Sequence, residues 1–430
     1  MTDKVFPIQN QSACLLKWAW STIYFNSGTS ASCHRTQKYV IPTDNFDLFH
    51  NLPDKVRARE LMLAGKWPGA GCEYCKNVED AGGLSDRQST LQEDTGWLVP
   101  PELDNNVVVD VTPTILEVYF KNTCNMKCVY CGPHHSSLWE EENRKFDGSF
   151  HNRVFDIKQA QHNDNYDQMV AGLWKYLDAD DRYKTIKRYH ILGGEPFLMS
   201  ELDDSIEFWR THPNPDLIFS VITNLNIPTA RFEKYLQQFR KLVLSNKIWK
   251  LQVTASLDCW DDEQEYVRYG LDLEQWQRNF ELLLNQPWIS VSINSAISAL
   301  TIKSLPKLLE RINAWNTQQT ATATWFQRDW AAEPIIHSFN TSAEFDNPYL
   351  FDGAVFAKDF ERILELMPNV TPTQQAQRRA MQGIATTSLA CKNNVDQIDK
   401  LKTYLTTLDQ RRNTNWPSHF AWLNKDFSVQ

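Results

Sequence analysis

The stretch Ile115-Leu-Glu-Val-Tyr-Phe120 has the pattern of a β-strand, and the chain then continues into Cys124-Asn-Met-Lys-Cys128-Val-Tyr-Cys131. Three cysteine thiolates with this C-x3-C-x2-C spacing can hold three irons of one cubic iron–sulfur cluster. Such clusters usually have four cysteine ligands, so one iron would stay open to a small molecule. A zinc site completed by His134 or His135 is the alternative, although zinc sites favour C-x2-C pairs from two separate places.

From about residue 113, short β-rich runs alternate with amphipathic helical stretches, which implies parallel βαβ units with right-handed crossovers. The expected strands are 115–120, 188–192, 217–223, 251–256, 291–297 and 321–326. Six units are too few to close an eight-stranded barrel. The sequence therefore predicts an α/β fold built on an open, partial (β/α)6 TIM-like barrel, with its chemistry at the carboxyl ends of the strands.

Three domains are expected along the chain. Residues 1–100 form an irregular, cysteine-rich N-terminal module with one clear helix, at 54–66, and residues 113–330 form the barrel. Residues 331–430 form a helical C-terminal extension with helices at 356–367, 372–384 and 395–412.

Composition excludes several classes of protein. A net charge of −9 over 430 residues argues against a broad nucleic-acid-binding surface, which needs a concentration of Lys and Arg. No secretory leader and no apolar run of membrane-spanning length is evident, so we expect a cytoplasmic protein without a membrane partner. Nine cysteines in such a chain indicate metal ligands and reduced thiols rather than disulfides.

A second motif follows the second expected strand directly, as Gly193-Gly194-Glu195-Pro196. The two glycines lack side chains, so a ligand can approach the backbone there, and the Glu195 carboxylate can pair with an ammonium group. Alone, this motif would indicate an ordinary turn after a strand. Its position one βα unit after the three cysteines favours a binding loop.

In combination, these two motifs resemble the radical S-adenosylmethionine (SAM) enzymes, over roughly residues 113–330. The resemblance implies that Cys124, Cys128 and Cys131 hold a [4Fe–4S] cluster whose open iron binds the amino and carboxylate groups of SAM. An electron, from a donor such as flavodoxin or ferredoxin, would then cleave SAM to methionine and a 5′-deoxyadenosyl radical that abstracts a substrate hydrogen.

The same resemblance implies which residues contact SAM, and these are Gly193, Gly194, Glu195, Pro196, Thr223, Asn224, Ser256 and Arg268. Leu225 departs from the family, which usually has glycine after the asparagine. A guanidinium suits a carboxylate because it can donate two parallel hydrogen bonds. The alternative roles are helix capping for Ser256 and a surface ion pair for Arg268. No catalytic acid, base or radical-relay residue is evident.

Four further cysteines precede the barrel, namely Cys14, Cys33, Cys72 and Cys75. Four thiolates can close the coordination of one cluster or one zinc ion, and composition alone would favour zinc. The spacing C-x13-G-x4-C through Gly28 resembles the SPASM/Twitch extension of radical SAM enzymes, as do residues 56–66 and 85–87. That extension usually follows the barrel, so the resemblance implies a permuted, Twitch-type module with one auxiliary iron–sulfur cluster.

The substrate is open between two enzyme hypotheses, a peptide or protein and a nucleotide or small metabolite. A non-catalytic iron–sulfur or zinc protein is the third hypothesis. Trp325 and Arg328 end the sixth expected strand, where they line either the substrate cavity or ordinary barrel packing. Cys259 and Cys391 are expected to be buried as small hydrophobic residues.

Overall fold

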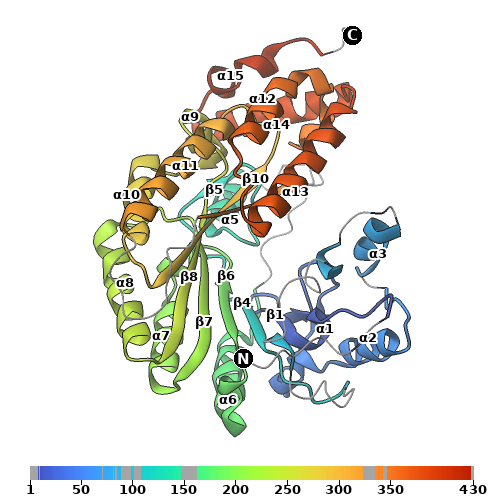
Figure 1. The fold of residues 1–430 in the computed structure, drawn as a ribbon, viewed down its shortest axis with the longest axis vertical. Coiled ribbons are helices and arrows are strands. Elements are labelled where there is room, and N and C mark those ends of the chain that lie inside the picture. The colour runs from blue at the N-terminus through green and yellow to red at the C-terminus, as the bar shows by residue number, and fades with distance from the viewer. Residues whose placement is uncertain are drawn as a thin grey trace. The chain divides into compact units, whose positions relative to one another are not determined.

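The computed structural model describes residues 8, 10–69, 71–80, 82, 85–88, 98–100, 108–146, 162–322, 335–341 and 346–427 (Figure 1). Contacts divide the chain into two compact units. The first comprises Met1–Asn122, Ala160–Val221 and Gln237–Leu251, and the second comprises Thr123–Gln159, Ile222–Leu236 and Gln252–Gln430. Strands β7 (Asn214–Thr223) and β8 (Ile248–Ser256) run from the first unit into the second.

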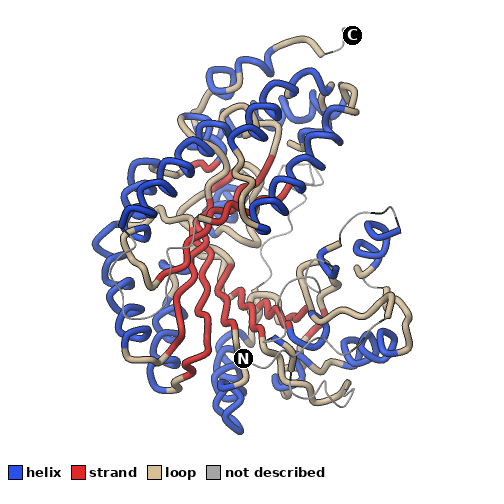
Figure 2. Tube along the Cα trace, viewed as in Figure 1, coloured by secondary structure: helices blue, strands red, loops and turns tan. Residues whose placement is uncertain are grey.

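Nine strands form one sheet in the order β11-β10-β8-β7-β6-β4-β1-β2-β3 (Figure 2). The pairs β1–β4, β4–β6, β6–β7 and β10–β11 are parallel, whereas β1–β2 and β2–β3 are antiparallel. The remaining strands are β1 (Trp20–Tyr24), β2 (Thr29–Ala31), β3 (Tyr39–Val40), β4 (Ile115–Tyr119), β6 (Arg188–Leu192), β10 (Ile289–Ile297) and β11 (Ile336–Thr341). The fold is therefore mixed α/β with a large, mainly parallel sheet, as predicted.

In the first unit, the two faces of β4 and β6 have different partners. Tyr189 of β6 packs edge-on against Trp209 of helix α7 (Ser200–Thr211), with ring centroids 5.7 Å apart. Side chains alternate along a strand, so His190 lies on the opposite face. Glu117 of β4 is in register with His190 and shares that face. Helix α6 (Tyr166–Asp178) completes the connection between β4 and β6.

The cysteine-rich N-terminal segment contributes a strand to this sheet. Helix α1 (Leu16–Ala19) leads into β1, which pairs in parallel with β4 along its whole length. Helices α2 (Pro53–Leu63) and α3 (Glu73–Asp80) follow, and α2 matches the helix expected at 54–66. The sequence did not predict β1, because Ser21 and Thr22 interrupt its apolar pattern, yet both side chains are buried.

The second unit holds a short antiparallel pair, β5 (Lys127–Cys128) with β9 (Arg268–Tyr269), and most of the C-terminal helices. The indole rings of Trp276, on α10 (Leu273–Leu284), and Trp315, on α11 (Leu305–Thr322), have centroids 6.2 Å apart. They form part of the aromatic core of this unit. Its helices are α5 (Ser137–Lys145), α9 (Asp262–Val267), α10 (Leu273–Leu284), α11 (Leu305–Thr322), α12 (Ala357–Leu366), α13 (Pro372–Leu389), α14 (Val395–Arg412) and α15 (Trp416–His419). Helix α8 (Thr229–Leu244) belongs partly to each unit.

Five of the six expected strands are present, each with its carboxyl end within one residue of the prediction. The strand expected at 321–326 is wrong at residues 321 and 322, because helix α11 continues through them; residues 323–326 lie outside the described ones. Strand β11 instead lies beside β10. The expected C-terminal helices are confirmed. Within the described residues, no helix has both the length and the apolar character that crossing a membrane requires.

Candidate functional site

The three clustered cysteines lie on a short, tightly folded segment of the second unit. Cys128 belongs to β5 and stands opposite Arg268 of β9. The Cys131 N–H donates to the Cys128 carbonyl at 3.0 Å, which closes a turn between the two cysteines. Cys128 is buried, whereas Cys124 and Cys131 are partly exposed. We call residues 124–131 the cysteine strap.

Hydrogen bonds from surrounding elements hold the backbone of this strap. The Trp139 indole of α5 donates to the Cys128 carbonyl at 2.9 Å, and the Tyr404 hydroxyl of α14 donates to the Val129 carbonyl at 2.7 Å. The Ser136 hydroxyl donates to the Met126 carbonyl at 2.6 Å. Three separate side chains thus satisfy buried carbonyl groups of the strap and hold its backbone.

The end of β7 lies against the first cysteine. The Asn224 side-chain amide donates to Asn125 Oδ1 at 2.9 Å and lies 3.8 Å from the Cys124 sulfur. Leu225, where the family usually has glycine, adopts a left-handed conformation with φ 53°. Its N–H donates to the Thr223 hydroxyl at 3.0 Å. The structure thus places Asn224 beside the strap, and its role toward SAM stays a prediction.

The Gly-Gly-Glu-Pro motif lies at the end of β6, in the first unit. The Gly194 N–H donates to the Lys121 carbonyl at 3.2 Å, and Lys121 lies three residues before Cys124. Gly193 has φ +122°, and a Cβ there would lie 3.0 Å from that same carbonyl. The loops that follow the adjacent parallel strands β4 and β6 therefore touch within the first unit, and a side chain at position 193 would crowd the Lys121 carbonyl and strain the backbone.

Glu195 is fully buried, and its carboxylate accepts a hydrogen bond from the Phe197 N–H at 3.1 Å. Pro196 begins the short 3-10 helix η5 (Pro196–Leu198) that this carboxylate caps. The ammonium-pairing role predicted for Glu195 is untested. Capping explains its fixed orientation, since a side-chain acceptor at a helix start satisfies an otherwise unpaired N–H.

Arg268 forms a buried ion pair rather than the surface pair that was its alternative role. Its guanidinium donates two hydrogen bonds to the Asp258 carboxylate, at 2.9 and 2.8 Å, and both side chains are buried. Asp258 also accepts from the Tyr130 hydroxyl at 2.7 Å and from the Ala296 N–H at 2.8 Å. This network joins the strap to β9 and β10. Ser256, the last residue of β8, is partly exposed.

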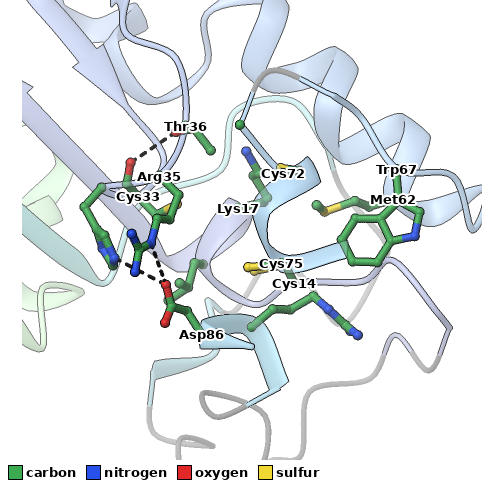
Figure 3. A pocket seen from close by; sticks show the side chains of 14 residues that line it. Cys14, Lys17, Cys33, Arg35, Thr36, Met62, Trp67, Cys72, Cys75 and Asp86 are labelled. Carbon is green, nitrogen blue, oxygen red and sulfur yellow. Dashed lines mark hydrogen bonds and ion pairs between the residues drawn. The ribbon is translucent and has the colours of Figure 1, made fainter. Parts of the chain in front are cut away.

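The four N-terminal cysteines line one pocket of the first unit (Figure 3). Cys14 precedes α1, Cys33 follows β2, and Cys72 and Cys75 lie at the start of α3. Three segments far apart in the sequence thus contribute cysteines to one pocket. The fold therefore places all four predicted residues around the same pocket, and their role as metal ligands stays a prediction.

Burial raises the pKa of the most deeply buried thiols in both sets. It raises the pKa of Cys14 to about 12, and the charge of Cys33 adds to this. In the strap it raises the pKa of Cys131 to about 12 and also raises that of Cys128, where the Arg268 charge opposes the shift. A bound metal ion deprotonates coordinating thiols, so ionisation of these groups would accompany metal binding.

Both donor sets suit metal centres by their chemistry. Three cysteines fit a cubic cluster with one open iron, and four fit a closed cluster or a zinc ion. In the part of the chain that the structure describes, no three Cys, His, Asp or Glu side chains already stand at the mutual spacing of a bound metal.

A polar pair that the sequence did not single out lies on the inner strands of the first unit. The Glu117 carboxylate accepts from the Thr22 hydroxyl at 2.9 Å and lies 3.6 Å from His190 Nδ1. Burial raises the pKa of Glu117 to about 6 and lowers that of His190 to about 3. At neutral pH this is a carboxylate beside a neutral imidazole rather than an ion pair. The only sequence signal for this pair was the alternation of side-chain direction along β6.

The remaining expectations have mixed outcomes. Cys259 is fully buried, as expected, whereas Cys391 is partly exposed, and its thiol donates to the Thr387 carbonyl at 3.2 Å. Trp325 and Arg328 lie outside the described residues.

No protein-family model matches the chain, and no curated protein matches it. Among the solved structures that it resembles is native anSMEcpe with bound AdoMet and Kp18Cys peptide, with a TM-score of 0.33 and 17% identity. The match covers 58% of this chain and 57% of that one, so the chain spans little more than half of that structure's length. A second is TYW1 with a lysine-pyruvate adduct bound, with a TM-score of 0.22 and 17% identity, covering 46% of this chain and 70% of that one. Both scores are too low for the likeness to assign an activity to this chain.

Proposed function

We propose that the protein is a radical SAM enzyme. The observation that carries the proposal is the bond from the Gly194 N–H to the Lys121 carbonyl. It joins the Gly-Gly-Glu-Pro loop to Lys121, which precedes Cys124 by three residues in the sequence, and the loop and the three cysteines are the two sequence motifs that the proposed chemistry needs. When bound, the cluster and SAM would supply reductive cleavage of SAM to a 5′-deoxyadenosyl radical that abstracts a substrate hydrogen. The mainly parallel sheet supports the partial (β/α)6 barrel proposed for residues 113–330.

The chain's own residues would bind and orient these groups. Cys124, Cys128 and Cys131 would ligate the cluster on a strap whose backbone is already fixed. Gly193 and Gly194 would leave room for the SAM amino group. The Glu195 carboxylate would accept hydrogen bonds from that ammonium group. Positioning matters because a displacement of about 1 Å can cost on the order of 100-fold in rate.

Arg268 has two proposed tasks. Its resemblance to the family indicates a contact with the SAM carboxylate. Its pairing with Asp258, which also accepts from Tyr130 of the strap, supports a role in holding the strap itself. A guanidinium carries five N–H donors, so two bonds to Asp258 leave others for a ligand.

The N-terminal quartet would hold a second metal centre, and its support is the pocket that all four cysteines line. We propose an auxiliary iron–sulfur cluster, with zinc as the alternative. About eight irons per reconstituted chain would indicate two cubic clusters, whereas about four irons with one zinc would indicate a zinc ion here.

The substrate is proposed to be a peptide or protein, with a nucleotide or small metabolite as the alternative, and the electron donor to be a flavodoxin or ferredoxin. Deuterium transfer from a labelled candidate substrate into 5′-deoxyadenosine would identify the substrate class. Transfer from a small metabolite but from no peptide would overturn the first choice.

The activity is tested by anaerobic reconstitution with SAM and dithionite. We expect 5′-deoxyadenosine from the wild type and from Cys391→Ala, whose cysteine lies in the C-terminal extension outside both sets. Cys128→Ala should form none, because the strap loses one iron ligand. Equal yields from the two variants would remove the strap from the reaction.

A further inference from the structure

Three cationic side chains line the N-terminal cysteine pocket, and two of them have carboxylate partners. The Arg35 Nε donates to Asp86 at 2.9 Å, and the Arg87 guanidinium forms two bonds with Glu79, at 2.9 and 2.5 Å. The third is Lys17. The charge of each arginine is therefore balanced within the protein.

Lys17 differs from both arginines. Its side chain is buried, with 6% of the residue exposed, and no carboxylate pairs with it among the described residues. It lies on α1, three residues after Cys14, and its backbone N–H donates to the Cys14 carbonyl at 3.1 Å. Burying a lysine side chain without a countercharge is unfavourable, so its position among the cysteines favours an anion in the pocket.

The Cys72 sulfur is the group that Lys17 faces. Figure 3 shows the Lys17 amine beside Cys72 at the pocket. Burial raises the pKa of the Cys72 thiol, and the nearby positive charge of Lys17 opposes the rise. The ammonium group thus lies near one of the four expected metal ligands.

Lys55 shows how this region satisfies a buried lysine that has no ligand to bind. Its ammonium group donates to four oxygens, the hydroxyls of Ser21 and Ser30 and the carbonyls of Ala31 and Phe49, at 2.6 to 3.2 Å. Lys17 has no such set of oxygen acceptors among the described residues. The contrast indicates that Lys17 is arranged for sulfur rather than for oxygen.

We propose that Lys17 is the countercharge and positioning residue of the metal centre formed by Cys14, Cys33, Cys72 and Cys75, and that it donates a hydrogen bond to the Cys72 sulfur. The inference rests on the proposed metal centre. Four thiolates around a zinc ion or an oxidised cubic cluster carry a net negative charge, which a buried ammonium group neutralises. Hydrogen bonds to the sulfurs and nearby charge also set the reduction potential of such clusters.

The test uses the full chain with Cys124, Cys128 and Cys131 replaced by Ala, so that the measured metal belongs to the N-terminal set. In this background, Lys17→Met should lose metal to a chelator about tenfold to 100-fold faster than the parent, as outer-shell changes typically weaken metal binding by that factor. Lys17→Arg keeps the charge and should retain metal nearly as well as the parent. Lys66→Met, which removes an exposed charge from the same unit, should match the parent.

A second measurement separates this role from ordinary packing. Metal-free Lys17→Met should be at least as stable to urea as the metal-free parent, because the substitution removes a buried charge. If the centre contains iron, its midpoint potential should fall in Lys17→Met, by about 59 mV for each tenfold change in the one-electron equilibrium. Lys17→Gln keeps a hydrogen-bond donor without the charge, so its midpoint potential should lie between those of Lys17→Met and the parent.

Failure of this inference is distinguishable from failure of the metal centre. If Cys72→Ser loses the metal but Lys17→Met retains it as the parent does, Lys17 has no such role and the centre stands. If Cys72→Ser binds as much metal as the parent, the quartet is not a metal centre, and the inference falls with it.

Discussion

The two cysteine sets are assembled in different ways. The strap carries three cysteines within eight residues, and its geometry comes from a local turn held by α5 and α14. The N-terminal quartet carries four cysteines from three separate segments, which meet only because α1, β2 and α3 pack around one pocket. If both sets bind metal, three thiolates leave coordination open for a small molecule, whereas four close it. The proposed tasks differ accordingly, substrate chemistry for the strap and support for the quartet.

The charged and polar groups around the two cysteine sets also differ. The strap is tied to a buried ion pair, Arg268 with Asp258, and its first cysteine lies beside the Asn224 amide at the end of β7. The quartet shares its pocket with the buried Lys17, which forms no ion pair with a carboxylate among the described residues. Polar strand ends around the strap favour a polar ligand, whereas a buried cation favours an anionic metal centre.

Breaking the ion pair of the strap should have the largest effect on stability. Arg268→Met leaves Asp258 as a buried, unpaired charge and should lower the free energy of unfolding by about 3–5 kcal/mol. Arg278→Met removes an exposed pair with Glu274, whose closest atoms are 3.5 Å apart, and should cost about 0.5 kcal/mol or less. Urea unfolding monitored by tryptophan fluorescence would measure both. Similar losses for the two variants would mean that the strap is not held by this pair.

The next largest effect is expected from the Gly-Gly-Glu-Pro loop, and it concerns the affinity for SAM. Glu195→Gln keeps the shape of the side chain but removes its charge, so SAM affinity should fall by about 2 kcal/mol, or about 30-fold. The iron bound by the strap should be unchanged. Glu207→Gln, on the exposed face of α7, provides the matched control. Isothermal titration of the reconstituted protein with SAM would measure these affinities. Unchanged affinity in Glu195→Gln would exclude a role for the Glu195 carboxylate in SAM binding.

The smallest expected effect concerns the inner strands of the first unit. The pKa of Glu117 rises from 4.5 to about 6 on folding, because burial penalises its charged form. Stability from this group is therefore present at low pH and is lost as the pH rises through about 6. Glu117→Gln has no such loss. Its unfolding free energy relative to the wild type should increase by about 1 kcal/mol between about pH 5 and about pH 7.5. A pH-independent difference between the two proteins would show that Glu117 does not titrate in this range.

Much of the fold and of the candidate sites could be predicted from local sequence. Strands β4 and β6 follow unbroken or alternating apolar patterns, and the strap and the Gly-Gly-Glu-Pro loop each lie within a few residues. Strand β1 was missed because its Ser21 and Thr22 are polar. They are buried through long-range partners, with Ser21 bonded to Lys55 and Thr22 to Glu117. Local pattern carries no information about such partners.

The same limit applies to charged residues. Arg268 is ten residues from Asp258, and a surface pair was a reasonable alternative, but the parallel sheet and the β5–β9 pair bury both groups. Lys17 lies in an apolar stretch next to Cys14, and nothing in its neighbours indicates the pocket. The balance of charges in a pocket is set by tertiary packing, so it becomes visible only in three dimensions.

One measurement tests most directly whether the two cysteine sets have separate tasks. The yield of 5′-deoxyadenosine and the metal content would be compared between anaerobically reconstituted Cys128→Ala and Cys72→Ala, with SAM and dithionite. Cys128→Ala should form no 5′-deoxyadenosine and keep the metal of the quartet. Cys72→Ala should lose that metal and still cleave SAM at the strap. Formation of 5′-deoxyadenosine by Cys128→Ala, or its absence from wild-type protein with a full complement of iron, would contradict the account.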